Sequence, residues 1–129
     1  NKISLFVAEP IHINQLLTED GLSKKVENKI KKKDYPNLYK LKKSSFYDDF
    51  SFFISDMKRL PYYKNKIIDI NIFMDALEKL AGNKKLYEYG EIPNDFGEDE
   101  KTMLKTFKKY GFKVHKGGKK KKKKEKKIK

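Results

Sequence analysis

The sequence has 129 residues, with 32 Lys and Arg against 18 Asp and Glu, a formal net charge of +14 and no cysteine. This length fits one domain with a modest core. The lack of cysteine excludes disulfide bonds, cysteine-based zinc sites and a thiol nucleophile. No apolar run approaches the roughly 18 residues that a membrane span needs, so we expect no membrane span.

The positive charge is concentrated at the C-terminus. The last fourteen residues, KGGKKKKKKEKKIK, contain ten lysines and one glutamate, and they contribute +9 of the net charge. Such a segment cannot collapse, because its like charges repel and it has one apolar side chain. We therefore expect residues 1–115 to form a single folded helical domain and residues 116–129 to form a flexible, disordered basic tail.

Two weak helices are expected in the N-terminal part. An apolar run over 3–7, which suits an edge strand, is followed by helical spacing of apolar residues over 13–17. A second weak helix is expected over 24–33, with Ser23 as its N-cap and Pro36 beyond its end.

A stronger helix is expected over 45–60. Aromatic and aliphatic residues recur there at steps of three and four, and Ser45 followed by Asp48 resembles a capping box. Pro61 ends the pattern. Phe52 lies off the apolar stripe of this helix, which indicates either a second buried side or contact with a partner protein.

Two further helices are expected over 69–81 and 98–110. Gly82 and Gly111 follow them directly, at the position where glycine commonly ends a helix. Edge strands are expected at Leu86, Tyr87 and Tyr89 and at Phe112 and Val114. The predicted fold class is mainly α, with three well-defined helices, two weaker ones and at most a minor β-hairpin or edge strands.

A lysine-rich stretch lies between the weak and strong helices. Residues 24–43, here called the lysine segment, contain nine lysines against Glu27 and Asp34. Lysines bind phosphates, and the interleaved tyrosines can stack on unpaired bases; alternatively, the segment is a solvated helix face with its tyrosine rings in the core. The predicted nucleic-acid contacts of this segment are Lys24, Lys25, Lys29, Lys31, Lys32, Lys33, Tyr35, Tyr39, Lys40, Lys42 and Lys43.

The tail gives the second set of predicted nucleic-acid contacts. Its lysine density exceeds what solubility requires, although a nuclear-localisation address or AT-rich codon usage also produces such runs. RNA is favoured over DNA, because Arg59 is the only arginine and sequence-specific reading of bases relies on arginine. The predicted contacts are Lys116, Lys119, Lys120, Lys121, Lys122, Lys123, Lys124, Lys126 and Lys127.

Catalytic and metal-binding patterns are weak. His12 and His115 are the two histidines, and neither has acidic neighbours at metal-ligand spacing. The stretch KIIDINIFMDAL has the hydrophobic rhythm of the second half of an EF-hand, but the preceding residues lack the oxygen ligands that calcium needs. We therefore expect no catalytic residue, metal, cofactor or small-molecule substrate.

Two functional hypotheses follow. The first is a non-enzymatic RNA-binding protein, a subunit or bound factor of a large ribonucleoprotein such as a ribosome. The second is a helical protein–protein interaction module, a metal-free and degenerate EF-hand-like subunit of a larger complex, with Phe52, Tyr62 and Tyr63 as its contact residues. Either function suits an intracellular protein of the cytoplasm, nucleus or nucleolus, or of an organelle if a targeting segment has been removed.

Overall fold

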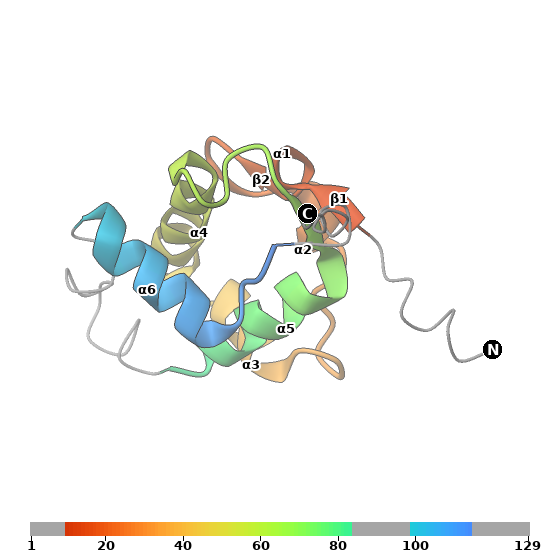
Figure 1. The fold of residues 1–129 in the computed structure, drawn as a ribbon. Helices are drawn as coiled ribbons and strands as arrows, with labels where there is room; N and C mark the ends of the chain where they lie inside the picture. Colours follow the sequence, from red (N-terminus) through yellow and green to blue (C-terminus); the bar gives the residue numbers. More distant parts are fainter. Residues whose placement is uncertain (1–9, 84–98, 115–129) are drawn as a thin grey trace, which may run out of the picture.

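A computed structural model of the protein describes residues 10–83 and 99–114 (Figure 1). These residues form six α-helices, one 3-10 helix and two small antiparallel sheets of two strands each. The mainly α fold class with minor β-structure is therefore confirmed. The strands expected over 3–7 and 86–89, and the tail over 116–129, lie outside the described residues.

The N-terminal part alternates short strands and helices. Strand β1 (Pro10–His12) leads directly into helix α1 (Ile13–Leu16), and β2 (Leu17–Thr18) pairs with β3 (Gly21–Leu22) in a tight hairpin. The weak helix expected over 13–17 is thus a single turn. It is short because Leu17 already has an extended backbone and starts the hairpin.

Two distant parts of the chain with nearly the same four-residue sequence pair with each other. The sequence analysis did not find this short repeat. Strand β1 pairs antiparallel with β4 (Ile67–Asp69), and Ile11 lies opposite Ile68. The paired segments read IHIN (11–14) and IDIN (68–71). In each, the side chain of the second residue accepts a hydrogen bond from the N–H two residues ahead, at 3.1 and 2.7 Å. Both strands therefore end in a residue that caps the following helix.

The expectation of a helix over 24–33 is wrong beyond its first turn. Helix α2 (Lys24–Glu27) is capped by Ser23 as expected, but the chain turns after Asn28 and buries Ile30 by a non-helical path. A helix that the sequence analysis missed, α3 (Pro36–Lys42), follows. Pro36 starts this helix because the first helical position needs no N–H donor.

The helix expected over 45–60 is present with two differences. Helix α4 (Tyr47–Ser55) continues into the 3-10 helix η2 (Asp56–Arg59), so the last turn is wound more tightly. Ser45 does not cap it. In the turn before α4, the Ser44 hydroxyl accepts a hydrogen bond from the Phe46 N–H at 3.1 Å and donates one to the Leu41 carbonyl at 2.7 Å.

The last two helices agree closely with the sequence pattern. Helix α5 (Ile70–Ala81) begins at the Asp69 cap, and α6 (Glu100–Tyr110) begins at an Asp99 cap. Gly111 has a left-handed backbone with φ of +98°, and the Phe112 N–H donates to the Phe107 carbonyl at 3.0 Å. These features define a Schellman motif. No strand forms at Phe112 and Val114, since Phe112 packs into the core instead.

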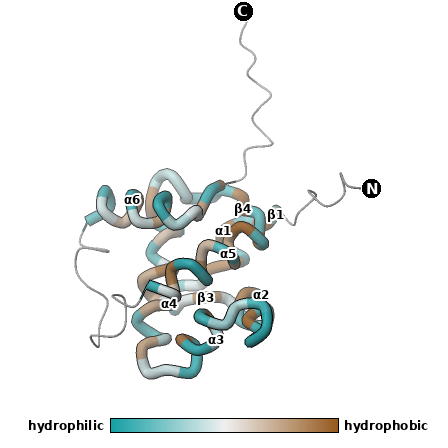
Figure 2. The backbone as a smooth tube through the Cα atoms, turned by 90° about the horizontal axis from the view of Figure 1, so that it is seen from below, coloured by the Kyte–Doolittle hydropathy of each residue, from teal (hydrophilic) through white to brown (hydrophobic). Residues whose placement is uncertain are grey.

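Helix α5 lies at the centre of the described residues. It packs against α3 on one side and α6 on the other, and Figure 2 shows it between these two helices. The Phe112 ring closes the core beside it, 5.5 Å from the rings of both Phe73 and Phe107. Within 10–83 and 99–114, no helix is long and apolar enough to cross a membrane.

Candidate nucleic-acid interface

The lysine segment (24–43) covers α2, the connection after it and α3. Its apolar side chains, Val26, Ile30, Leu38 and Leu41, are buried in the core. Eight of the nine lysines are exposed, and Lys29 is half-buried. The local fold therefore directs the apolar side chains inward and leaves the ammonium groups in water.

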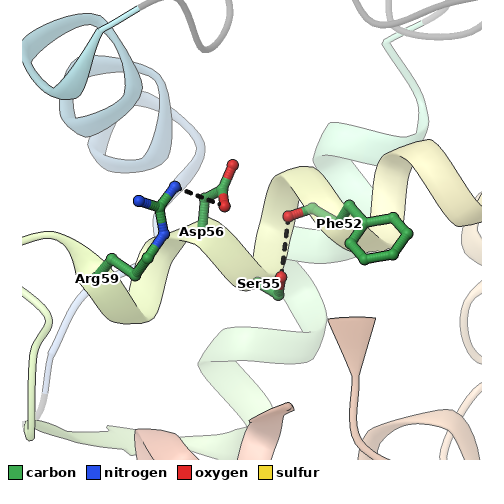
Figure 3. Close-up of polar contacts among 4 residues, drawn as sticks. All are labelled: Phe52, Ser55, Asp56 and Arg59. Atoms are coloured by element: carbon green, nitrogen blue, oxygen red, sulfur yellow. Dashed lines mark hydrogen bonds and ion pairs between the residues drawn. The ribbon is translucent and has the colours of Figure 1, made fainter. Parts of the chain in front are cut away.

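These lysines have no acidic partner among the described residues. The one ion pair there joins Arg59 to Asp56, with 2.8 Å between Nη2 and Oδ1 (Figure 3). Glu27, an acidic residue of the lysine segment, instead accepts a hydrogen bond from the Tyr47 hydroxyl at 2.8 Å. Burial and this hydrogen bond raise the pKa of Tyr47, so its hydroxyl stays protonated and keeps donating.

The beginning of α3 is held by a residue of α5. The two carboxylate oxygens of Glu78 accept hydrogen bonds from the N–H groups of Asn37 and Leu38, at 3.0 and 2.9 Å. A carboxylate is favourable there because the first N–H groups of a helix have no partner within the helix. The lysines of α3 are thus carried by a helix whose start is fixed to the central helix.

The two tyrosines of the lysine segment were expected either to stack on bases or to pack in the core, and their rings are only partly buried. Tyr35 and Tyr39 are half-buried and pack against the hydrophobic core. The Lys43 ammonium lies 5.2 Å from the centre of the Tyr39 ring. Burial and the nearby carboxylates of α5 and Asp34 raise the pKa of Tyr35. Each ring therefore offers at most one edge or part of a face to a base. The exposed part of Tyr35 lies near the carboxylates of Asp34, Asp75 and Glu78.

The three predicted protein-contact residues differ in their exposure. Phe52 is 49% exposed. Its ring projects from α4 away from the Arg59–Asp56 ion pair (Figure 3). Tyr62 is half-buried, with the Lys108 ammonium 4.3 Å from its ring centre. Tyr63 has no exposed surface, and its hydroxyl donates to the Phe112 carbonyl at 2.6 Å. Tyr63 is a core residue, so the surface expected from the sequence excludes it.

A second basic surface lies on α6, and the sequence analysis did not identify it. The name α6 lysines is used here for four exposed lysines of the helix and one exposed lysine just beyond its end: Lys101, Lys105, Lys108, Lys109 and Lys113. Lys101, Lys105 and Lys109 are four residues apart, which places them along one side of the helix. Met103 and Phe107 on the other side are buried. The four-residue spacing of these lysines could have been found in the sequence. The tail and the lysine segment were chosen instead because their lysines are more closely spaced.

An open pocket adjoins the α6 lysines. Its volume is about 490 Å³. Its lining combines apolar surface, two positive charges and one carboxylate, from Tyr62, Asp69, Ile72, Lys108, Phe112, Lys113 and Val114. Ile72 is 40% exposed there.

The tail lysines, from Lys116 to Lys127, lie outside the described residues. Across 10–83 and 99–114, no cluster of three or more His, Asp or Glu side chains could hold a metal ion. Comparison of the chain with protein-family models, curated proteins and solved structures found no match.

Proposed function

We propose that the protein is a non-enzymatic RNA-binding protein, a subunit or bound factor of a large ribonucleoprotein such as a ribosome. The observation that carries this proposal is the state of the lysine segment: eight of its nine lysines are exposed, and none forms an ion pair with a described carboxylate. Ammonium groups in this state are free to neutralise phosphates and release the counterions of a polyanion.

The lysines act as point charges on the sugar–phosphate backbone. Contacts of this kind fix the position of a nucleic acid without reading its sequence. Arg59, the only arginine, is already paired with Asp56, so no guanidinium is free for bidentate recognition of guanine. Binding by shape and charge is typical of folded RNA, which supports RNA over DNA as the partner.

The dependence of affinity on salt tests this proposal. If about eight phosphates are neutralised, the logarithm of the affinity falls with a slope of about −6 to −7 against the logarithm of salt concentration. We expect the triple variant Lys24→Gln, Lys32→Gln, Lys40→Gln to make this slope less negative by about 2. Its matched control, with Lys64, Lys66 and Lys79 changed to Gln, removes the same charge from exposed positions outside the lysine segment.

The control is expected to keep the slope of the unmodified protein. Equal slopes for both triple variants would show that only net charge matters, and a flat response of the unmodified chain would exclude RNA binding altogether. The same titration with a DNA duplex of equal length shows whether the preference for RNA holds.

A protein–protein interaction module is the second candidate, favoured by the exposure of Phe52. An aromatic ring that is 49% exposed on a helix is a common anchor at protein interfaces. Deletion of residues 116–129 separates the two candidates. Association with the ribonucleoprotein weakens strongly under the first and survives under the second, where Phe52→Ser abolishes it instead.

A further inference from the structure

The α6 lysines and the lysine segment lie on opposite sides of the central helix. Helix α3 is joined to α5 through the Glu78 hydrogen bonds, and α6 is joined to the end of α5 through a 2.6 Å hydrogen bond between Asn83 Nδ2 and the Tyr110 hydroxyl. Figure 2 shows α6 at one end of the described residues and α2 and α3 at the other. The two basic surfaces therefore lie on helices at opposite ends of the described residues.

Both surfaces have the same chemical character. The α6 lysines are all exposed, and none of them is paired with a described carboxylate. Two acidic residues lie at the start of α6. Asp99 caps the helix by accepting the Thr102 N–H at 2.8 Å, and Glu100, in the first turn, forms no ion pair with a described lysine. The Lys108 ammonium also lies 4.3 Å from the Tyr62 ring centre, and both residues line the pocket.

We propose that the protein bridges two separate RNA segments, with one phosphate backbone on the lysine segment and a second on the α6 lysines. This inference rests on the proposed function and extends it from binding RNA to joining two parts of an RNA assembly. The hydrophobic core between α3 and α6 acts as a rigid spacer that sets the distance between the two backbones.

The physical reason for two-sided binding is electrostatic. Two RNA segments repel each other, and a protein with positive charge on one face would leave a second segment unshielded. Positive charge on both faces places cations between the two backbones. Once one segment is bound, the second binds at the high effective concentration that a shared assembly provides.

The stoichiometry of binding to short RNA hairpins tests this inference. Native mass spectrometry or sedimentation velocity of the full chain with excess hairpin is expected to show complexes of one protein with two hairpins. Changing Lys101, Lys105 and Lys109 to Gln is expected to leave one-to-one complexes, as is the lysine-segment variant with Lys24, Lys32 and Lys40 changed to Gln. The control with Lys64, Lys66 and Lys79 changed to Gln is expected to keep two hairpins bound.

The outcomes separate this inference from the proposed function. If the α6 variant still binds two hairpins, the second site is not on α6 and bridging as proposed is wrong, although RNA binding stands. If the unmodified protein binds one hairpin with the expected salt dependence, the function stands and bridging fails. If the unmodified protein binds no hairpin, both fail. Circular dichroism of each variant verifies that the helices remain folded.

Discussion

Glu78 and Leu38 are joined by a hydrogen bond of 2.9 Å between a carboxylate oxygen on α5 and the backbone N–H near the start of α3. The second oxygen of Glu78 accepts the Asn37 N–H at 3.0 Å. The cap of α3 thus comes from a residue 40 and 41 positions further along the chain. The orientation of the lysine segment depends on this contact.

Replacement of Glu78 by Ala is expected to lower the free energy of unfolding by about 1–2 kcal/mol, because two helical N–H groups lose their acceptor. Urea denaturation followed by circular dichroism measures it. Asp75→Ala is the matched control, since Asp75 is exposed on the same helix and accepts no helix-capping hydrogen bond. We expect Asp75→Ala to change stability by less than about 0.5 kcal/mol. Similar losses for both variants would contradict the capping role.

Gly21 and Gly111 both have positive φ, at +134° and +98°, but their surroundings differ. A Cβ on Gly21 would overlap the Ser51 hydroxyl, which accepts the Leu22 N–H, whereas a Cβ on Gly111 would meet no atom within 4 Å. We expect Gly21→Ala to cost about 2–4 kcal/mol through strain and overlap. Gly111→Ala is expected to cost about 1 kcal/mol through backbone strain alone. Thermal unfolding of the two variants shows which of them loses more stability. A larger loss for Gly111→Ala than for Gly21→Ala would refute this explanation.

The Tyr63 hydroxyl donates a hydrogen bond that connects Phe112, after α6, to the loop after η2. In Tyr63→Phe the buried Phe112 carbonyl loses this donor, so a loss of about 1–2 kcal/mol in unfolding free energy is expected. Tyr62→Phe is the control, because the neighbouring ring is half-buried and its contacts are made by the ring. It should leave stability nearly unchanged in the same denaturation experiment.

Stability is expected to fall as pH rises above 10. Burial, reinforced by the hydrogen bond to Glu27, raises the pKa of Tyr47, and burial raises the pKa of Tyr63. The folded pKa values lie above the unfolded value of 10.0, so the unfolded chain releases these protons first. The stabilisation is complete below pH 10 and is lost above it.

Comparison with a double variant isolates these two groups. Tyr47→Phe with Tyr63→Phe is less stable at neutral pH, but its stability should decline less steeply above pH 10. The difference in slope is up to about 2.7 kcal/mol per pH unit, since each tyrosine contributes about 1.36. Both proteins carry the same lysines, so lysine titration cancels in the comparison. Parallel pH profiles would mean that the two hydroxyls ionise equally in both states.

The sequence predicted those parts of the fold that local signals determine. Helices α5 and α6 were found because their apolar spacing, acidic caps and following glycines all agree. Helix α3 was missed because Pro36 was interpreted as a helix breaker, and its cap, Glu78, is distant in sequence. The helix predicted over 24–33 was too long for the same reason, since tertiary packing turns the chain at Asn28 to bury Ile30.

The candidate interface was predictable in composition but not in arrangement. The sequence showed that 24–43 is rich in lysine, and helical periodicity correctly placed Phe52 off the apolar stripe. Phe52 and Tyr63 are both aromatic residues beside apolar ones, yet one is half exposed and the other is buried. Tyr63 packs against residues distant in sequence: its ring centre lies 6.0 Å from that of Phe107, and its hydroxyl donates to the carbonyl of Phe112, 49 residues away. Pattern analysis does not detect such distant contacts.

The pairing of Ile11 with Ile68 has a consequence for how the chain folds during synthesis. Strand β1 leaves the translation machinery about 60 residues before its partner, a delay of roughly 3 to 12 seconds at ordinary elongation rates. During that interval β1 has no strand to pair with, and the Ile13 N–H lacks the Lys66 carbonyl that it donates to at 2.9 Å in the final fold. Closure of the long loop between β1 and β4 is therefore expected to be a late step in folding.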